Sequence, residues 1–304
     1  MNPSVTAVVP TRDRPELLRR AVRSILDQDY DGDVHCLIVF DGGDPVPVEV
    51  PTSQRRSLRM LTNLRTPGLA GARNTGILEA DGDLVAFCDD DDEWMPDKLR
   101  AQVRELEAEP QAEIVGSGIE VRYEGRPGVV RIPPAPRIGM EVLVRSRVTE
   151  LHPSTFLIRR DALLDGLGLV DEELPGSYSE DYDLLLRAAR RGTVLAVMSP
   201  LVRVHWHASS YFAARWQTIY SALRYLLERH PEFSSDRRGL ARVTGQIAFA
   251  CVGAGRRRDG RAWAIRTLRL NLAEKRAWLA LVVSLRILSA ETVLRAANRR
   301  GRGI

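Results

Sequence analysis

Residues 84–99 read LVAFCDDDDEWMPDKL, so four consecutive aspartates directly follow an apolar run. The run LVAFC is typical of a strand buried on both faces of a parallel sheet. Four adjacent carboxylates repel one another, and the end of a buried strand is an unfavourable place for them unless a cation binds there. Hard divalent cations prefer carboxylate oxygens, and Mg²⁺ typically takes one or two of them together with substrate phosphates. A solvated acidic loop is the simpler alternative, but the buried strand before it and Trp94-Met95-Pro96 after it favour a cation-binding site.

The segments around this stretch predict an α/β fold. Short β-branched runs alternate with amphipathic segments in the first half of the chain, which is typical of a mostly parallel central sheet with helices on both faces. The expected strands cover residues 4–9, 34–40, 58–62, 84–88 and 114–121. The expected helices lie within residues 10–28, from about residue 70 to 80, and from residue 96 to about 109.

Polar segments follow three of these strands, namely Pro10–Asp13, Asp41–Gly43 and Asp89–Asp92. Ligands of open α/β sheets bind beyond the carboxyl ends of the strands. We therefore expect the three segments to share one edge of the sheet.

The second half of the chain predicts three further strands and a helix, followed by a basic helical region. Residues 122–150 are rich in Pro, Gly and Arg and are expected to be irregular. Residues 155–160, 194–199 and 201–207 are predicted strands, and YSEDYDLLLRAARRG, residues 178–192, is a predicted helix. The helical pattern with basic faces after about residue 211 predicts two parts, residues 1–212 and a basic helical region over residues 213–304.

Three polar groups outside the acidic run are candidates for chemistry. The glycine-punctuated helix start at residues 68–76 carries Arg73 and could bind phosphate, although it is neither a Walker loop nor a GxGxxG motif. Glu180 and Asp181 open a helix, where acidic residues also fit the helix dipole without any catalysis. His205 and His207 are two residues apart on a strand, so at most one of them faces a site.

Six segments in this order resemble the family-2 inverting glycosyltransferases of GT-A fold, over roughly residues 4–212. They are PTRDRP (10–15), FDGG (40–43), GLAGARNTG (68–76), FCDDDDEWMPDKL (87–99), YSEDYDLLLRAARRG (178–192) and VHWHASS (204–210).

The resemblance implies a donor sugar carried on a nucleoside diphosphate. The donor-binding residues that it implies are Pro10, Thr11, Asp13, Asp41, Arg73 and Asp90. Asp41 would accept a hydrogen bond from the base, which suits the imide of uracil or thymine and favours a UDP- or dTDP-sugar. Asp90 would lie beside the ribose or the diphosphate. The first loop departs from the family pattern, because Asp13 stands where Asn is common.

The resemblance also implies a Mn²⁺ or Mg²⁺ cofactor and a catalytic base. Within the acidic run, Asp91 matches the metal ligand best and Asp89 the first carboxylate of the DxD pair, with the register open by one residue. His207 is the implied contact to metal or diphosphate, and His205 is the alternative. Asp181 matches the base that removes the proton from the acceptor hydroxyl.

Glu180 is the implied partner of that base. The resemblance also implies an acceptor hydroxyl on a glycan, a lipid-linked sugar or a small molecule, as in cell-surface polysaccharide, glycolipid or glycosylated-metabolite synthesis. Two other functions stay open, a sugar nucleotidyltransferase and a non-catalytic nucleotide-sugar binding protein. PTRDRP stands where a nucleotidyltransferase carries its glycine-rich, arginine-containing signature.

Composition and charge predict the compartment and the partners. Three cysteines without CxxC spacing are typical of free thiols in a reducing compartment, and no leader or membrane span is evident, so a cytoplasmic protein is expected. Residues 256–302 hold thirteen Arg and Lys against three acidic residues. A peripheral location at the inner face of the membrane is one interpretation of this excess, and a helical hairpin packed through its apolar face is the other. Nucleic acid is not an expected partner, because the arginines lack interleaved aromatic residues.

Overall fold

The structure is a computed structural model that describes residues 2–123, 127–206 and 215–293. The chain divides into two compact units. Unit 1 comprises Met1–Leu143, Val148–Glu172 and Glu180–Ala208, and unit 2 comprises Val144–Arg147, Glu173–Ser179 and Ser209–Ile304. The boundary expected near residue 212 stays a prediction.

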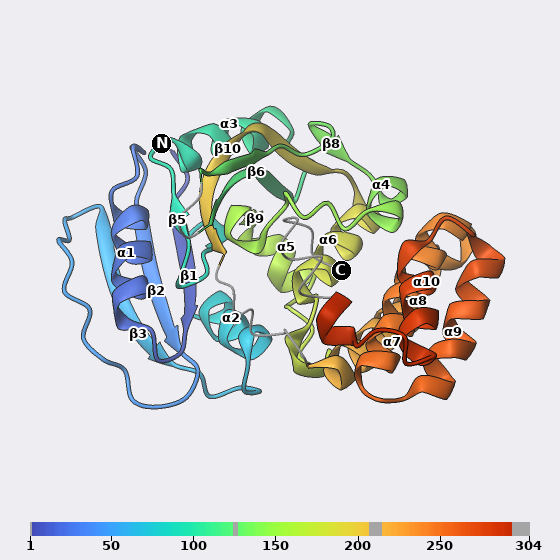
Figure 1. The fold of residues 1–304 in the computed structure, drawn as a ribbon. Helices are drawn as coiled ribbons and strands as arrows, with labels where there is room; N and C mark the ends of the chain where they lie inside the picture. The colour runs from blue at the N-terminus through green and yellow to red at the C-terminus, as the bar shows by residue number, and fades with distance from the viewer. Residues whose placement is uncertain (1, 124–126, 207–214, 294–304) are drawn as a thin grey trace. The chain divides into compact units, whose positions relative to one another are not determined.

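Unit 1 is built on one twisted sheet with the strand order β3-β2-β1-β4-β9-β6-β10-β5, and β7 and β8 pair with β6 and β10 (Figure 1). Strands β1 to β4 run parallel to their neighbours in this group, and β6 runs parallel to β10. Between the two parallel groups, β9 is antiparallel to both β4 and β6. The strands are β1 Val5–Thr11, β2 Val34–Phe40, β3 Arg56–Thr62, β4 Leu84–Phe87, β5 Glu93–Trp94, β6 Ile114–Tyr123, β7 Val129–Arg131, β8 Arg137–Ile138, β9 Leu157–Arg159 and β10 Val194–Trp206.

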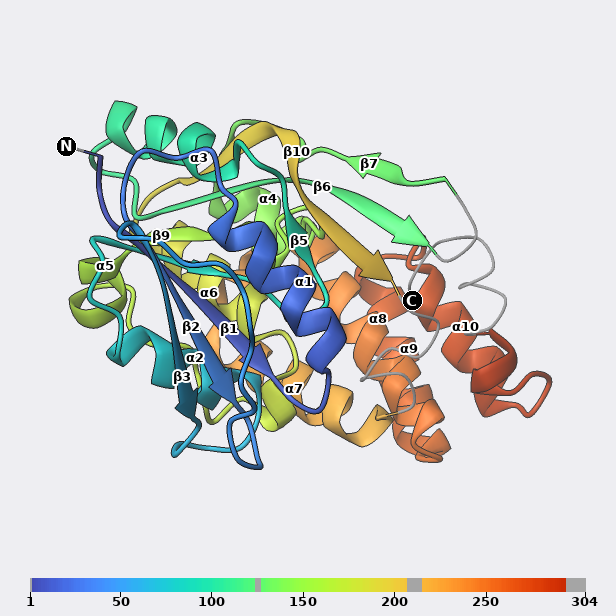
Figure 2. The ribbon, with the colours of Figure 1, turned by 90° about the vertical axis from the view of Figure 1, so that its left-hand side faces the viewer.

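Helices cover both faces of this sheet. Successive residues of a strand point to opposite faces, so one strand can contact helices on both sides. Val5, Ala7 and Val9 belong to the same buried cluster as apolar residues of α1 and α3. On the opposite face Gly76 of α2 lies so close to Val8 that an added Cβ would overlap its side chain. Figure 2 shows α1 against β1 and β2. The helices are α1 Pro15–Leu26, α2 Leu69–Leu78, α3 Lys98–Ala108, α4 Met140–Arg145, α5 Arg160–Asp165 and α6 Glu180–Arg191. The predicted α/β fold with a central sheet flanked by helices is confirmed.

The carboxyl ends of β1, β2 and β4 meet at one edge, as the sequence predicts. Thr11 pairs with Phe40 at the end of β2, and Val8 pairs with Phe87 at the end of β4. The backbone N–H of Asp41 donates to the carbonyl of Thr11 at 2.9 Å. The three polar segments that follow these strands therefore begin side by side.

Two expectations about the second half of the chain are wrong. Residues 122–150 are not wholly irregular, because β6 continues to Tyr123 and β7, β8 and α4 lie in this stretch. The two strands expected at 194–199 and 201–207 are one strand, β10, whose register against β6 shifts on both sides of Pro200. Pro200 has no backbone N–H to donate to the neighbouring strand, so the sequence around it resembles the end of a strand. In the structure the strand continues past this irregularity.

Unit 2 contains four longer helices among its described residues, α7 Trp216–Arg229, α8 Arg237–Gly253, α9 Arg257–Leu270 and α10 Lys275–Ser284. Small residues let the last three approach closely, because Ala248, Ala264, Ala277 and Ala280 are fully buried in one cluster with Phe249. The helical character expected of this region is confirmed. In the part of the chain that the structure describes, we find no helix with the length and apolar content of a membrane span.

Candidate active site

The acidic run forms a tight turn at the carboxyl edge of β4. Ser154 organises this turn, because its hydroxyl accepts a hydrogen bond from Asp89 N at 3.0 Å and donates to Asp92 Oδ2 at 2.5 Å. The carbonyl of Ser154 also accepts a hydrogen bond from the Trp94 indole at 3.0 Å. Ser154 lies in the short 3₁₀ helix Pro153–Thr155, immediately before β9. The inserted antiparallel strand thus brings a distant segment onto the acidic turn.

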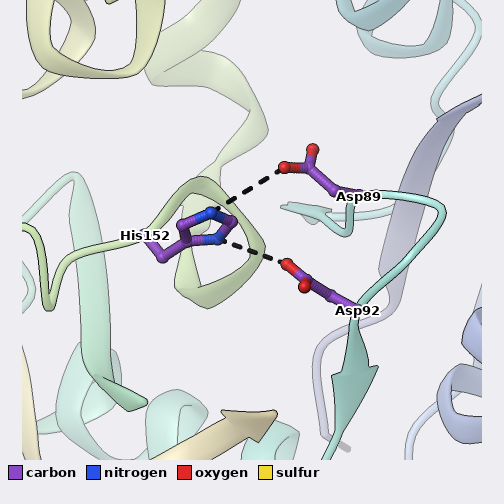
Figure 3. A group of neighbouring side chains, drawn as sticks. All are labelled: Asp89, Asp92 and His152. Atoms are coloured by element: carbon purple, nitrogen blue, oxygen red, sulfur yellow. Dashed lines mark ion pairs between the residues drawn. The ribbon is translucent and has the colours of Figure 1, made fainter. Parts of the chain in front are cut away.

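The same segment places His152 against two of the aspartates (Figure 3). Nδ1 of His152 lies 3.3 Å from Asp92 Oδ2, and Nε2 lies 4.0 Å from Asp89 Oδ2. Asp89, Asp92 and His152 each offer one ligand atom, and these atoms lie within 4.8 Å of one another. Two carboxylates and an imidazole form a donor set that suits a divalent cation.

Burial makes this donor set costly without a cation. It raises the pKa of Asp92 well above its ordinary value, and the charges of Asp89 and Asp91 add to the shift. Desolvation lowers the pKa of His152, which keeps the imidazole neutral as a metal ligand requires. A bound cation would offset the repulsion among the carboxylates, so these residues fit the metal that the sequence predicts.

Asp90 and Asp91 face the loop after β1 instead. The hydroxyl of Thr11 donates to Asp90 Oδ2 at 2.8 Å, and Arg14 Nη1 lies 3.3 Å from Asp90 Oδ1. The same nitrogen of Arg14 lies 2.8 Å from Asp91 Oδ2. Burial raises the pKa of Asp90 to about 6, against the opposing hydrogen bond from Thr11. The first loop and the acidic turn are therefore joined, with the Arg14 guanidinium half-exposed at the edge.

Arg73 joins the acidic turn to the start of α6. Its side chain is 1% exposed, and Nη2 donates to Asp89 Oδ1 at 2.7 Å while Nη1 donates to Glu180 Oε1. The guanidinium also lies 5.4 Å from the centre of the Phe87 ring. Burial alone would lower the pKa of Arg73, but Glu180, Asp89 and Asp181 outweigh that effect and raise it.

The predicted catalytic pair sits where α6 begins, after Ser179 with φ of 71°. Glu180 is buried, and burial raises its pKa to about 7 against the opposing charge of Arg73. Asp181 is only partly buried, so its carboxylate is the more accessible of the two. Asp181 directly follows Glu180, which Arg73 joins to Asp89, so it lies close to the acidic turn. Its charge acts to raise the pKa values of Glu180, Arg73 and His152. The structure thus brings the acidic turn and the predicted base together.

The remaining predicted donor residues are placed differently. Asp41 accepts hydrogen bonds from Gly68 N at 3.0 Å and Asn63 Nδ2 at 2.8 Å, at the start of α2. Pro10 is buried within β1, and Asp13 is exposed with φ of 56° and lies 4.0 Å from Arg12. Among the described residues, neither forms a hydrogen bond or an ion pair with the acidic turn.

The two histidines of the predicted metal contact are only partly described. The ring of His205 lies 2.7 Å from Glu93, which also pairs with Arg20 at 3.0 Å. Its backbone N–H lowers the pKa of Asp92, against the larger effect of burial. His207 lies outside the described residues, so its assignment stays a prediction, as does that of Asp91.

The sequence analysis gives no individual role to His152, Arg14 or Asp92, although Asp92 belongs to the acidic run. The motif His152-Pro153-Ser154 directly before a predicted strand was the available signal. This signal was weak, because a histidine before a proline is as compatible with a structural role as with a role as a metal ligand.

The family model described as glycosyl transferase family 2 matches residues 6–167, which is more than half of the chain. Together with the fold and the acidic turn at its edge, this match assigns the chain to the class of GT-A glycosyltransferases. The chain belongs to glycosyl transferase family 2.

Curated relatives agree with this assignment. The succinoglycan biosynthesis protein ExoW of Rhizobium meliloti is 39% identical over 101 residues, which are 31% of this chain and 31% of that protein. The UDP-Glc:alpha-D-GlcNAc-diphosphoundecaprenol beta-1,3-glucosyltransferase WfgD of Escherichia coli is 30% identical over 33% of this chain and 39% of its own length. The matched part is therefore between 31% and 39% of the length of these two relatives. An uncharacterized glycosyltransferase of Rickettsia prowazekii, RP339, is 26% identical over 75% of this chain and 69% of its length.

Solved structures share the fold at low sequence identity. S. aureus TarS 1-349 in complex with UDP-GlcNAc superposes with a TM-score of 0.58 at 15% identity, over 98% of this chain and 92% of that one. The mannosyltransferase PcManGT of Pyrobaculum calidifontis, in complex with GDP-Man and Mn²⁺, gives a TM-score of 0.56 at 18% identity, over 94% of this chain and 88% of that one.

Proposed function

We propose that this protein is a metal-dependent inverting glycosyltransferase that moves a sugar from a nucleoside-diphosphate donor to an acceptor hydroxyl. The observation that carries the proposal is the ion-pair chain from Asp89 through Arg73 to Glu180. It holds the acidic turn and the helix start with Asp181 in one arrangement. A cation-binding set beside an accessible carboxylate is what this transfer requires.

The donor side of the proposal rests on the shared edge of β1, β2 and β4. Thr11 and Asp90 are joined there and are proposed to lie along the ribose and diphosphate. Asp41 is proposed to accept a hydrogen bond from the base of a UDP- or dTDP-sugar. The neighbours TarS and PcManGT hold UDP-GlcNAc and GDP-Man, so a GDP-sugar is the alternative that the donor screen below includes.

The two arginines of the site are proposed to act differently. Arg14 is half-exposed beside Asp90 and Asp91, so it can turn toward a donor diphosphate. Arg73 is buried with both terminal nitrogens bound to carboxylates. A direct contact of Arg73 with the nucleotide stays a prediction, and its burial favours a positioning role toward Glu180 and Asp89.

The metal site is proposed to comprise Asp89, Asp92 and His152, with Asp91 as a further ligand if Arg14 releases it. A bound Mn²⁺ or Mg²⁺ supplies charge stabilisation for the departing diphosphate. Asp89 is shared between this set and Arg73, so the position of the metal ligands and that of α6 depend on each other.

The proposed chemical step uses these residues as follows. Asp181 accepts the proton of the acceptor hydroxyl while the oxygen of that hydroxyl bonds to the anomeric carbon. The bond from that carbon to the diphosphate oxygen breaks on the opposite side, and its electrons leave with the nucleoside diphosphate. Attack from the opposite side inverts the anomeric configuration. Glu180 is proposed to hold the start of α6 through Arg73 and not to exchange the proton itself.

The acceptor is proposed to be a growing cell-surface glycan or a lipid-linked sugar. Relatives named for succinoglycan and amylovoran biosynthesis, and one named for a diphosphoundecaprenol-linked acceptor, support this class. A small-molecule acceptor is the alternative.

The test is a donor screen followed by product analysis. UDP-, dTDP- and GDP-sugars with Mn²⁺ should include one that raises the melting temperature of the protein, because a bound ligand stabilises the folded state. Incubation with that donor and an acceptor glycan should release nucleoside diphosphate. Release of pyrophosphate from a sugar phosphate and a nucleoside triphosphate would identify a nucleotidyltransferase. Donor binding without any turnover, across glycan and lipid-linked acceptors, would identify a binding protein.

A further inference from the structure

The C-terminal helices carry charges that the protein itself does not neutralise. Arg258, Arg261 and Arg269 recur on one face of α9, at spacings of three and eight residues, and all are exposed. Among the described residues none of them forms an ion pair. The nearby acidic residues Asp259 and Glu274 pair with other arginines of the same region. This face therefore keeps its full positive charge.

Large apolar side chains are exposed on and beside the same face. Ile265 lies between Arg261 and Arg269 on α9 and is 43% exposed. Leu272, in the turn after α9, is 71% exposed, and Trp278 of α10 is 50% exposed. The Trp278 indole donates to the Leu272 carbonyl at 2.8 Å, so the ring is held beside the turn. Single exposed apolar residues are ordinary, but a tryptophan and two aliphatic residues grouped among arginines are typical of an interaction surface.

We propose that this α9–α10 surface, defined by Arg258, Arg261, Ile265, Arg269, Leu272 and Trp278, binds the anionic surface of a lipid bilayer. Arginines attract anionic headgroups, and a tryptophan with aliphatic neighbours inserts at the level of the headgroups. The absence of a spanning helix among the described residues fits binding at the surface. Nucleic acid offers phosphates too, but it offers no environment for Ile265 and Leu272.

The inference goes beyond the proposed transfer reaction, since it concerns unit 2 alone and does not depend on any residue of the candidate active site. It is tested with the full-length protein and vesicles of phosphatidylcholine, with and without phosphatidylglycerol. Sedimentation should show binding to the anionic vesicles only. Raising NaCl from about 0.1 to about 0.5 M should weaken it, because the Debye length shortens.

Two variants test the surface itself. The triple charge reversal R258E/R261E/R269E should lower the partition coefficient at least about tenfold, and L272S/W278S should lower it roughly fivefold at unchanged net charge. The matched control is R23E/R100E/R104E, which changes the net charge equally on exposed positions of α1 and α3. This control should retain most of the binding. Circular dichroism and the donor-induced rise in melting temperature establish that each variant is folded.

Three outcomes overturn the proposal. The first is no binding to anionic vesicles, and the second is equal loss in the control and in R258E/R261E/R269E. The third is binding to an RNA oligonucleotide that L272S/W278S leaves intact, with no vesicle binding. Loss of transfer activity in any variant bears on the proposed function and not on this surface, because vesicle binding is measured without donor.

Discussion

The acidic turn of unit 1 and the α9–α10 surface of unit 2 handle charge in opposite ways. Asp92 of the turn and Arg73, which binds the turn from α2, are almost completely buried, and each has partners at hydrogen-bond distance. On α9, Arg258 and Arg261 are exposed and have no ion-pair partner among the described residues. A buried charge costs several kcal/mol unless it is paired, whereas an exposed charge is hydrated at almost no cost.

This difference separates two kinds of functional site. The buried charges must be held in one arrangement by the fold, so their geometry identifies the chemistry that they support. The exposed arginines are unconstrained, so only their number and surroundings indicate a partner. The following predictions test that contrast, beginning with the largest expected effect.

The first prediction separates chemistry from binding within the buried site. Asp181→Asn should lower the transfer rate about 10²- to 10⁴-fold, because the amide cannot accept the acceptor proton. Affinity for the nucleotide should change little. The measurements are release of nucleoside diphosphate and calorimetric titration of the nucleotide, with Asp161→Asn on the exposed start of α5 as the control. A parallel loss of nucleotide affinity would instead assign Asp181 to donor binding.

The second prediction compares one substitution in the buried site of unit 1 with one on the exposed surface of unit 2. Arg73→Ala should lower the free energy of unfolding by about 3–5 kcal/mol, because Glu180 and Asp89 lose the cation between them. Arg261→Ala should change it by less than about 0.5 kcal/mol. Urea unfolding measures both values.

Arg73→Lys extends this test if Arg73→Ala does not fold. It keeps the charge but cannot bridge both carboxylates with a planar fork. It should reduce the maximal rate more than it raises the Michaelis constant for the donor. A rise in the Michaelis constant alone would support a direct nucleotide contact of Arg73.

The third prediction decides which members of the buried cluster hold the metal. His152→Ala and Asp92→Asn should each lower Mn²⁺ affinity about 10- to 100-fold in the presence of nucleotide, as loss of a coordinating group does. Asp91→Ala should lower it as well only if Arg14 releases that carboxylate. Titration of Mn²⁺ by electron paramagnetic resonance measures the affinities, and His35→Ala on β2 is the control. An effect of Asp91→Ala without one of His152→Ala would contradict the cluster and favour the DxD register of the sequence.

The smallest expected effect concerns Glu172, a paired carboxylate of unit 1. Partial burial raises its pKa, but hydrogen bonds from Asn74, Arg65 and Thr66 outweigh this and lower it to about 2. A depressed carboxyl pKa stabilises the folded state above the unfolded value near 4.5. That contribution is lost as the pH falls through about 2.

Glu172→Gln should therefore be less stable than the unaltered protein at pH 7. The difference in free energy of unfolding should shrink between about pH 5 and pH 2. Urea unfolding at several pH values measures this, and a difference that does not vary with pH would remove the electrostatic explanation.

Local patterns predicted most of unit 1 because each element is specified by nearby residues. The apolar run before Asp89 and the facing apolar residues Leu18, Val22 and Ile25 of α1 identify a strand and a helix by period alone. The common edge of β1, β2 and β4 followed from these elements, since parallel strands have their carboxyl ends together. The position of the acidic run was predictable for the same reason.

The pairings within the acidic run were not predictable, because the backbone of a tight turn points successive side chains in different directions. Asp89 and Asp92 face His152, while Asp90 and Asp91 face Arg14. Because the four residues are identical, the sequence does not indicate which of their side chains face His152 and which face Arg14.

The sequence by itself determined the α/β fold, the edge at which the acidic run lies and the basic character of the C-terminal helices, because periodicity and charge are properties of neighbouring residues. Only the tertiary structure decided which partners the buried charges have. His152 reaches Asp92 across 60 residues of chain through the antiparallel insertion of β9, and Arg73 reaches Glu180 across 107. Contacts of that separation arise when elements pack together and desolvate the charges between them, and no local pattern encodes which charges will meet.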